Sequence, residues 1–581
     1  MRSATRFRRL PLILPLLGFV LATLLLTYPL AFRLSDFIND VPAVDHGANY
    51  WNLWWAERWV SSSETQLLYT DYLFHPEGVP LVFHTLTVLN GLLSIPIQRL
   101  FGLTVAYNLI VLLSFVLTGL ATYLLARHWG AERLSGFVVG LWFAFSVYRF
   151  HHWDHLNLLS THWLVFFLWA LSRFLHSARL KDALLTGVFW AATGLCSWYY
   201  LVFAGTSGVL LCVCVALRQG RALQIRRWLL GCLIVTGVFL LIMSPYVSAI
   251  LKARQDAPPD DLSFAVSAYF SVDVLCLLLP HTLLSPFVNR AGLFAFTAEC
   301  PEAIFPTTTV LLALLGLILM PKRLPRALPW EWIGMGSVFA LLSLGPFLKV
   351  GGLVQMGEMG YVLMPGYLFK KMPMMGFFKV FDRFLLVTHL GLMVFVAPFL
   401  GFLIARLAEW LRLRPTSIWA VVIVLSVAQG WHGGISMTDK KPSDFFTQVA
   451  SETGDFSIVE VPFDTEAYPS HGRAMFHQTI HHKRTINGEV SRPPKSLHTR
   501  LERNLVISLL KKYYEVEQYP VSEEDRIRFL EDAHSLRLRY VVLYPERLRI
   551  GYDQTLEEFL VGTLNGTMVY TEPGMRVFRI E

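Results

Sequence analysis

Three aspartates lie close together after the first long apolar segment: Asp36, Asp40 and Asp45. A carboxylate within hydrogen-bond reach of a hydroxyl group can act as a general base and remove its proton. A solvated loop aspartate is common, so none of the three is a site on its own. Asp45 differs from the others because Asp45-His46 leads directly into a tryptophan-rich stretch. The sequence therefore favours Asp45 as a catalytic base.

The tryptophan-rich stretch predicts a helix. Trp51, Trp54, Trp55 and Trp59 share one face at a period of 3.6 residues. Tryptophan prefers the boundary between membrane and water. We therefore expect this helix to lie flat on the outer leaflet and to hold Asp45 at the depth of the lipid headgroups. The alternative is an interfacial anchor without chemistry.

A base of this kind suits a transferase that uses a lipid-phosphate donor, since the acceptor hydroxyl must lose a proton beside the anomeric carbon. The leaving lipid phosphate must then be bound by fixed cations or hydrogen-bond donors. The candidates on segments expected outside are His75, His84, Arg149, Lys379 and Arg383.

A second polar cluster is the stretch Tyr148–His155 (YRFHHWDH), followed by Leu156-Asn157, at a turn between two apolar runs. Three histidines and an aspartate within five residues resemble a metal cluster. However, His151 and His155 would need a continuous helix through the turn to act as a ligand pair. We favour hydrogen bonding of His152, His155 and Asn157 to a polar substrate, with solvation at the interface as the alternative.

A third polar cluster opens a later apolar run at Phe377–Phe384 (FFKVFDRF). Lys379 and Arg383 could grip a phosphate group there. The alternative is a boundary at which long side chains reach toward water and Asp382 pairs with Arg383.

The elements that must position these residues are membrane helices. The chain has 581 residues, is 54% hydrophobic and only 16% charged, and has a mean hydropathy of +0.47. Repeated apolar runs of about 17–25 residues fit a bilayer core of about 30 Å. The net charge of +8 does not indicate nucleic-acid binding, because the basic residues sit in short loops between the runs. The six cysteines form no CxxC pair, so a redox or zinc role has no support.

The fold class we expect is mainly α: a polytopic helical membrane protein of about eleven spans. The expected spans cover residues 10–32, 103–126, 134–150, 156–175, a hairpin across 183–217, 228–250, 304–320, 331–349, 383–406 and 418–436. Residues 86–101 are too short for a span and are predicted to form an interfacial helix. With the N-terminus in the cytoplasm, every short cytoplasmic loop is basic.

This arrangement gives two domains. Residues 1–436 form the membrane domain, with an outer loop at 33–102 that carries interfacial helices. Residues 437–581 are more polar and predict a small extracytoplasmic α/β domain. Its expected elements are strands at 456–463 and 539–544, helices at 522–535 and 555–564, and a terminal hairpin at 568–580.

The whole pattern resembles the GT-C class of membrane glycosyltransferases. The residues that carry the resemblance are Tyr28-Pro29, Asp45, Trp51-x3-Trp55, Phe74-x-Pro76-x-Gly78, Ala106-Tyr107-Asn108, His155-Leu156-Asn157, Val459–Pro462, Gln478-Thr479 and Ser491-Arg492.

The resemblance implies transfer of a sugar from a polyprenyl-phosphate donor to an acceptor outside the cytoplasm, by an enzyme of the bacterial cytoplasmic membrane. It implies that the catalytic acid is in the first outer loop, where Asp45 is the first candidate and Asp40 the second. The paired acidic motif of several members is absent. No metal ligand is assigned, and a need for a divalent metal stays open. The alternative functions are a lipid or glycan transporter and a non-catalytic scaffold.

Overall fold

The computed structural model divides the chain into two compact units. The bundle unit comprises residues 1–32, 109–243 and 259–435, and the sheet unit comprises 33–108, 244–258 and 436–581. The structure describes residues 12–36, 46–220, 224–256, 264–275, 329–350, 353–354, 356–357, 360–372, 375–376, 378–431, 443–463, 472–515, 523–548 and 552–580. Asp40, Asp45 and the expected span at 304–320 lie outside these residues.

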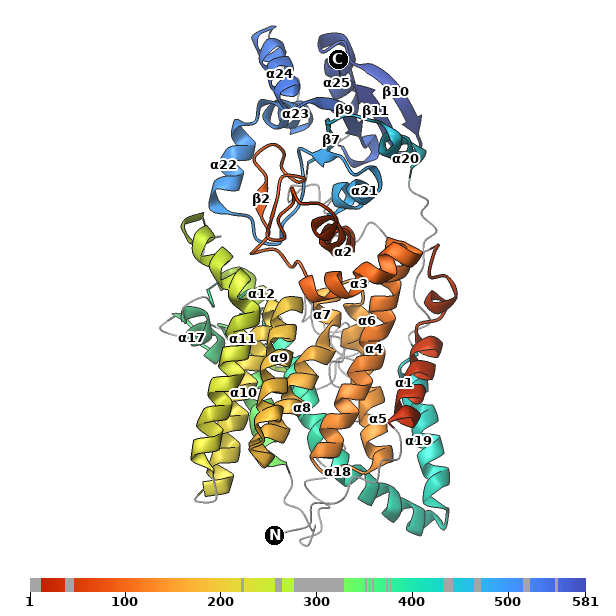
Figure 1. Cartoon of the computed structure of the whole chain (residues 1–581), viewed down its shortest axis with the longest axis vertical. Coiled ribbons are helices and arrows are strands. Elements are labelled where there is room, and N and C mark those ends of the chain that lie inside the picture. The colour runs from red at the N-terminus through yellow and green to blue at the C-terminus, as the bar shows by residue number, and fades with distance from the viewer. Residues whose placement is uncertain are drawn as a thin grey trace. The chain divides into compact units, whose positions relative to one another are not determined.

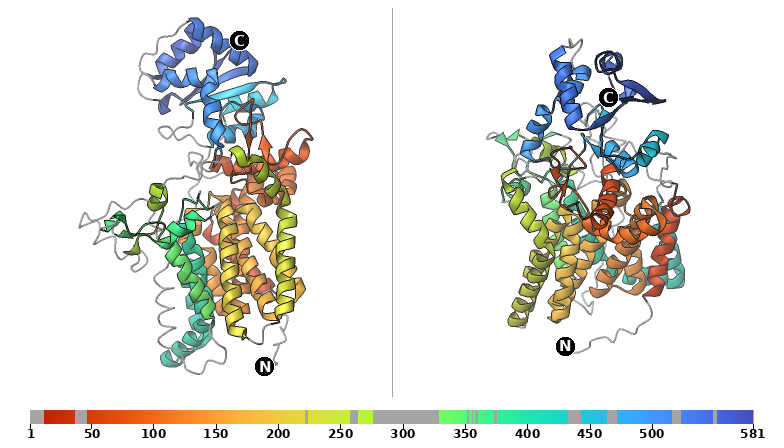
Figure 2. Two further views of the ribbon diagram at one scale, coloured as in Figure 1. Left: turned by 90° about the vertical axis from the view of Figure 1, so that its left-hand side faces the viewer. Right: turned by 45° about the horizontal axis from the view of Figure 1, so that its top comes forward.

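The bundle unit consists of apolar helices that run alongside one another (Figures 1 and 2). Those within the unit are α1 (Ile13–Leu26), α5 (Arg133–Ala144), α6 (Val147–His151), α7 (Leu156–Leu159), α8 (Thr161–Ser177), α9 (Leu180–Cys196), α10 (Trp198–Gln219), α16 (Trp330–Ser343), η4 (Asp382–Phe384), α18 (Leu385–Leu411) and α19 (Pro415–Gln429). Two further helices, α4 (Leu103–His128) and α11 (Ile225–Ala253), begin or end in residues of the sheet unit.

Membrane-spanning length is confirmed for part of the expected set. Among the described residues, five helical segments are long and apolar enough to cross a bilayer: 103–128, 156–177, 198–219, 225–256 and 382–411. The apolar helices α1, α3 (Val88–Phe101) and α19 are shorter. The chain is therefore a polytopic membrane protein, and the total of about eleven spans stays a prediction.

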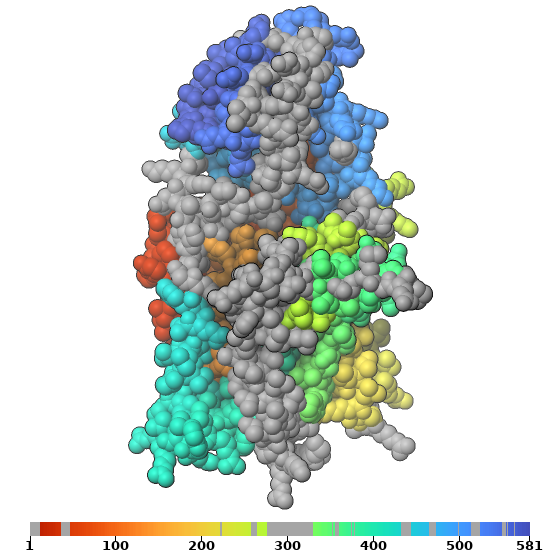
Figure 3. Space-filling view, turned by 180° about the vertical axis from the view of Figure 1, so that it is seen from behind, coloured from red at the N-terminus to blue at the C-terminus, as the bar shows by residue number. Residues whose placement is uncertain are grey.

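Large apolar side chains cover the outside of this unit, as a lipid environment requires. On α18 and α19, Trp410 is 79% exposed, and Val424 and Leu425 are 65% and 61% exposed. The teal surface of Figure 3 includes both helices. On α11, Leu233 and Leu241 are exposed to 70% and 76%.

The sheet unit contains a five-stranded sheet of order β10-β11-β9-β7-β8. The strands are β7 (Ser457–Val461), β8 (Arg484–Thr485), β9 (Leu538–Leu543), β10 (Thr567–Glu572) and β11 (Met575–Arg579). β7 pairs in parallel with β8 and β9, and the hairpin β10–β11 adds antiparallel strands beside β9. The α-helices of its C-terminal part are α20 (Asp444–Ser451), α21 (Arg473–His481), α22 (Lys495–Arg503), α23 (Leu505–Glu515), α24 (Glu523–Ser535) and α25 (Tyr552–Glu558).

The elements predicted for the C-terminal segment are confirmed one by one. The strands expected at 456–463 and 539–544 are β7 and β9, and the helix expected at 522–535 is α24. The helix expected at 555–564 is α25 with the π-helical turn η6 (Phe559–Thr563), and the terminal hairpin is β10–β11. The existence of a separate domain at 437–581 stays a prediction.

Part of the first long loop belongs to this sheet unit. Beside β8, the Thr485 amide donates to the carbonyl of Tyr72 at 2.9 Å, and the His75 amide donates to the carbonyl of Thr485 at 3.0 Å. These bonds extend the edge of the sheet with residues 72–75. The edge strand β8 is therefore paired by the chain's own N-terminal part.

Helix α2 (His46–Ser61) confirms the predicted tryptophan-faced helix but corrects its environment. Trp51 and Trp55 are completely buried and stack at 5.2 Å, and Trp54 is also buried. They pack against α21 and Tyr72 within the sheet unit. The prediction that this face anchors the helix in lipid is therefore wrong for these three residues, because protein covers them.

Candidate functional site

The polar stretch Tyr148–His155 forms a compact cluster in the bundle unit, where α6 ends and α7 begins (Figure 1). His152 and His155 are each fixed locally. The Nδ1 atom of His152 lies 2.9 Å from the carbonyl oxygen of Tyr148, and the Nδ1 atom of His155 lies 2.7 Å from a carboxylate oxygen of Asp154. The rings of His152 and His155 are 5.8 Å apart. The cluster therefore presents imidazoles in defined orientations.

Arg383 is brought into this cluster from more than 220 residues later in the chain. Its guanidinium lies over the ring of Tyr199 at 4.5 Å, and its charge acts on both Tyr148 and His152. Burial, followed by the positive charges of Arg383 and His155, lowers the pKa of His152 to about 3. His152 is therefore neutral at physiological pH, while Arg383 supplies the fixed positive charge.

Two tyrosines of α10 contact residues of this cluster. Tyr199 and Tyr200 follow the start of α10, and both are buried. The hydroxyl of Tyr200 donates to the carbonyl of Leu158 at 2.5 Å and lies 3.5 Å from the hydroxyl of Tyr148. These contacts fix α10 against α6 and α7. Neither tyrosine was expected from the sequence, because both sit in an apolar run with no polar neighbour that would single them out.

Arg149 has different contacts from Arg383. It is completely buried, and its three nitrogens donate to the carbonyls of Ala144 and Leu159 at 2.9 Å and to the Ser114 hydroxyl at 3.2 Å. These bonds tie the ends of α5 and α7 to α4. They show that Arg149 takes part in the packing of the helices, and its role in substrate binding stays a prediction.

The other two candidates in this unit lie near the cluster in sequence. Asn157 is buried on α7, two residues after His155. Lys379 is half-buried in the segment that leads into η4, four residues before Arg383. Both stay predictions as substrate-binding residues.

Among the residues that the structure describes, no group of three or more histidine, cysteine, aspartate or glutamate side chains has the geometry to hold a metal ion. Within the cluster, the Nδ1 atom of His155 faces Asp154, and that of His152 faces a carbonyl oxygen.

The histidines of α21 form a second buried network in the sheet unit. His477 places Nδ1 3.0 Å from both carboxylate oxygens of Glu460, which also accepts from the Tyr544 hydroxyl at 2.8 Å. Burial raises the pKa of Glu460, but the combined effect of His477 and Tyr544 outweighs burial and holds it below its ordinary value. His481, four residues later on the same helix, is completely buried.

The ring of Phe446 separates the two histidines of α21 that are four residues apart. It stacks on His477 at 4.0 Å and lies 5.7 Å from His481. Burial lowers the pKa of His481 to about 3. The network therefore keeps His481 neutral and pairs His477 with a carboxylate, which fixes α21 to β7.

Comparison with known proteins supplies the fold. Neither a protein-family model nor a curated protein matches the sequence. Among solved structures, the arabinofuranosyltransferase AftD from Mycobacteria is 13% identical, with a TM-score of 0.57, and the alignment covers 99% of this chain and 40% of AftD. An AftD variant gives a TM-score of 0.58 at 14% identity, with 100% of this chain and 42% of the variant covered.

Two further structures are less similar. The oligosaccharyltransferase AglB from Archaeoglobus fulgidus is 13% identical with a TM-score of 0.46, and 99% of this chain and 75% of AglB are covered. ArnT from Cupriavidus metallidurans, bound to undecaprenyl phosphate, is 12% identical with a TM-score of 0.45, and 97% of each chain is covered. The fold assignment rests on AftD, of which this chain spans about two fifths. The resemblance to GT-C glycosyltransferases is thus confirmed as a likeness of fold.

Proposed function

We propose that this protein is a membrane glycosyltransferase that moves a sugar from a polyprenyl-phosphate donor to an acceptor outside the cytoplasm. The observation that carries the proposal is the guanidinium of Arg383, held over Tyr199 beside the neutral His152. A planar cation fixed at the end of a span suits a phosphate group better than a mobile lysine does. The fold shared with a glycosyltransferase supports the same reaction class.

The roles we assign follow the order of bond changes. Asp45, or Asp40 as the second candidate, accepts the proton of the acceptor hydroxyl. The resulting oxygen attacks the anomeric carbon as the bond from that carbon to the phosphate oxygen breaks. Arg383 binds the donor phosphate and stabilises the charge on the departing polyprenyl phosphate, while His152, His155, Asn157 and Lys379 bind the rest of the donor. A direct displacement of this kind inverts the anomeric carbon.

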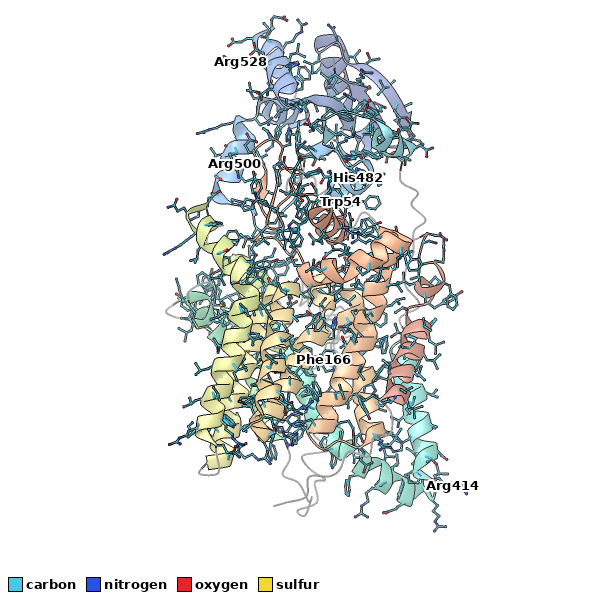
Figure 4. The ribbon with its side chains drawn as sticks, in the orientation of Figure 1. Trp54, Phe166, Arg414, His482, Arg500 and Arg528 are labelled. Carbon is cyan, nitrogen blue, oxygen red and sulfur yellow. The ribbon has the colours of Figure 1, made fainter. Side chains whose placement is uncertain are left out.

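The proposed setting is the bacterial cytoplasmic membrane, with the N-terminus in the cytoplasm and residues 437–581 outside. It depends on the basic loops that the positive-inside rule places in the cytoplasm. Arg414, labelled in Figure 4, ends one such cluster with Arg406 and Arg412. The sugar, the lipid and the acceptor are not specified by these residues.

The test is a transfer assay with purified protein and a panel of polyprenyl-phosphate sugars, in which release of polyprenyl phosphate is measured. We expect Asp45→Asn to abolish release while expression and membrane insertion stay normal, because an amide cannot accept the proton. The matched control is Asp36→Asn, a change at an exposed aspartate nearby. Near-normal release by Asp45→Asn would reject Asp45 as the base. No release by the wild-type protein with any donor would favour the transporter or scaffold alternatives.

A further inference from the structure

Helix α2 begins at His46, directly after the predicted base, and is held by a side chain more than 400 residues away. The Trp51 indole Nε1 donates to the amide oxygen of Gln478 on α21 at 2.7 Å. Both side chains are completely buried. A buried indole N–H needs a partner, so this hydrogen bond fixes which face of α2 turns toward α21.

Gln478 uses its other atoms to hold two more segments. Its amide nitrogen donates to the carbonyl of Tyr72 at 2.7 Å and to the carbonyl of Lys483 at 2.9 Å. One side chain therefore joins α2, the first long loop and the turn before β8. Only an amide offers the one acceptor and two donors that these partners require.

A second contact holds the next residue of α2. His84 lies between Asn52 and the C-terminal segment, with Nε2 3.0 Å from Asn52 Oδ1, while the Ser491 amide donates to Nδ1 at 3.1 Å. The backbone donor requires Nδ1 to be an acceptor, so Nε2 carries the proton that Asn52 accepts. The Asn52 amide in turn donates to the carbonyl of Thr85 at 2.8 Å.

The two helices also touch at both ends of α21. A Cβ added at Gly47 would overlap the carbonyl oxygen of Gly472, so the backbones meet where both helices begin. At the other end, the rings of Trp54 and His482 lie 5.7 Å apart, and both residues are labelled in Figure 4. α21 therefore controls the position of α2 along its first half.

We propose that Gln478 is a positioning residue for the transfer reaction. It sets the placement of α2, whose first residue, His46, directly follows the predicted base in the sequence, and it does so without touching substrate. This inference rests on the proposed function. Displacement of a catalytic group by about 1 Å can reduce a rate about 100-fold, so a change at this anchor has a direct kinetic consequence.

The test replaces Gln478 with methionine, which has a similar length but lacks the three hydrogen bonds. Its matched control is Gln448→Met, at an exposed glutamine on α20. For Gln478→Met we expect kcat per folded protein to fall by about tenfold or more, with the donor KM within about twofold. We also expect faster hydrogen exchange in the three segments that Gln478 holds, which are residues 46–61 and the segments around Tyr72 and Lys483. Gln448→Met should match the wild type in all three measurements.

A second variant keeps the inference falsifiable if Gln478→Met folds poorly. Trp51→Phe removes the indole donor from the other side of the same bond. The two changes together should lower kcat no further than Gln478→Met alone, because the hydrogen bond that Trp51→Phe removes is already lost in Gln478→Met. The inference would be overturned if either variant folds and keeps the wild-type kcat. It would also be overturned if the losses in kcat of the two single variants add fully in the double variant. An active wild-type enzyme with an unaffected Gln478→Met variant would overturn it while leaving the proposed function intact. A wild-type protein inactive with every donor would overturn both.

Discussion

Arg149 and Arg383 illustrate what residue type alone leaves open. Both were expected to bind substrate because both lie at the ends of apolar runs. Arg149 donates hydrogen bonds to two backbone carbonyls and to a serine hydroxyl. Arg383 instead lies over an aromatic ring within reach of His152. We propose that the guanidinium of Arg383 contacts a phosphate group, and the difference between the two arginines depends on partners that are distant in sequence.

The residue-scale prediction concerns Arg383. Arg383→Gln should raise the donor KM by roughly 10- to 100-fold, because a hydrogen bond to a charged group contributes about 1.5–3 kcal/mol. Arg383→Lys should recover only part of the loss, since lysine lacks the planar group that lies over Tyr199. Steady-state kinetics with a polyprenyl-phosphate sugar provide the measurement.

The control for Arg383 lies on α18, the helix that directly follows η4. Arg406 of α18 also lies over an aromatic ring, that of Phe402 at 5.6 Å, but it is largely exposed and pairs with Glu409. Arg406→Gln should leave the donor KM unchanged. An equal effect of the two substitutions would show that general surface charge, rather than a phosphate site, determines the KM.

At the scale of elements, α2 shows how a helix can be predicted correctly and its surroundings wrongly. The spacing of Trp51, Trp54 and Trp55 gives one apolar face, and the structure confirms that face. Hydropathy and period do not distinguish a lipid surface from a protein surface, because both exclude water. The partner helix α21 is more than 400 residues away in the sequence, so no local sequence pattern predicts its contact with α2.

The element-scale prediction uses the close approach of these helices. Gly47→Ala should destabilise the protein by about 1–3 kcal/mol, since the added methyl group meets the backbone of Gly472, which cannot rotate away. The measurement is thermal unfolding followed by tryptophan fluorescence. Gly334→Ala in α16 is the control, because a Cβ there meets nothing within 4 Å. That substitution should stabilise or have no effect, as alanine is the better helix former. Equal unfolding temperatures for the Gly47 variant and the wild type would refute the tight contact.

At the scale of the whole molecule, the sheet unit is assembled from three separate parts of the chain: 33–108, 244–258 and 436–581. The Ser496 amide donates to Asp256 at 2.8 Å, and Arg484 pairs with Asp71 at 3.0 Å, so each early part has polar contacts with the last one. The first loop therefore depends on the C-terminal segment for its partners.

The corresponding prediction is that a chain ending at residue 436 loses the structure of its first loop. Trp51 and Trp55 would lose the protein surface that buries them. We expect a red shift of tryptophan emission and rapid proteolysis within residues 46–80, with membrane insertion of the bundle unit retained. Protection of 46–80 equal to that of the full-length protein would contradict this dependence.

The sequence by itself determined the parts of this protein that depend on local pattern. Apolar runs specified membrane helices, and alternation and turn residues specified β7, β9, α24 and the β10–β11 hairpin. These features form because a bilayer core requires long apolar runs, whereas strands and surface helices require hydrophobic residues at their own periods. The residue types at His152, His155 and Arg383 likewise marked a polar cluster, which the structure brings together.

Only the tertiary structure decided which polar groups meet. Gln478 with Trp51, His84 with Ser491, and Arg383 with Tyr199 each join residues more than 180 positions apart. Such pairs arise because buried donors and acceptors must find partners wherever the packed helices place them. That demand follows from the three-dimensional packing of the chain, whereas the periodicity of each helix is a property of its own residues.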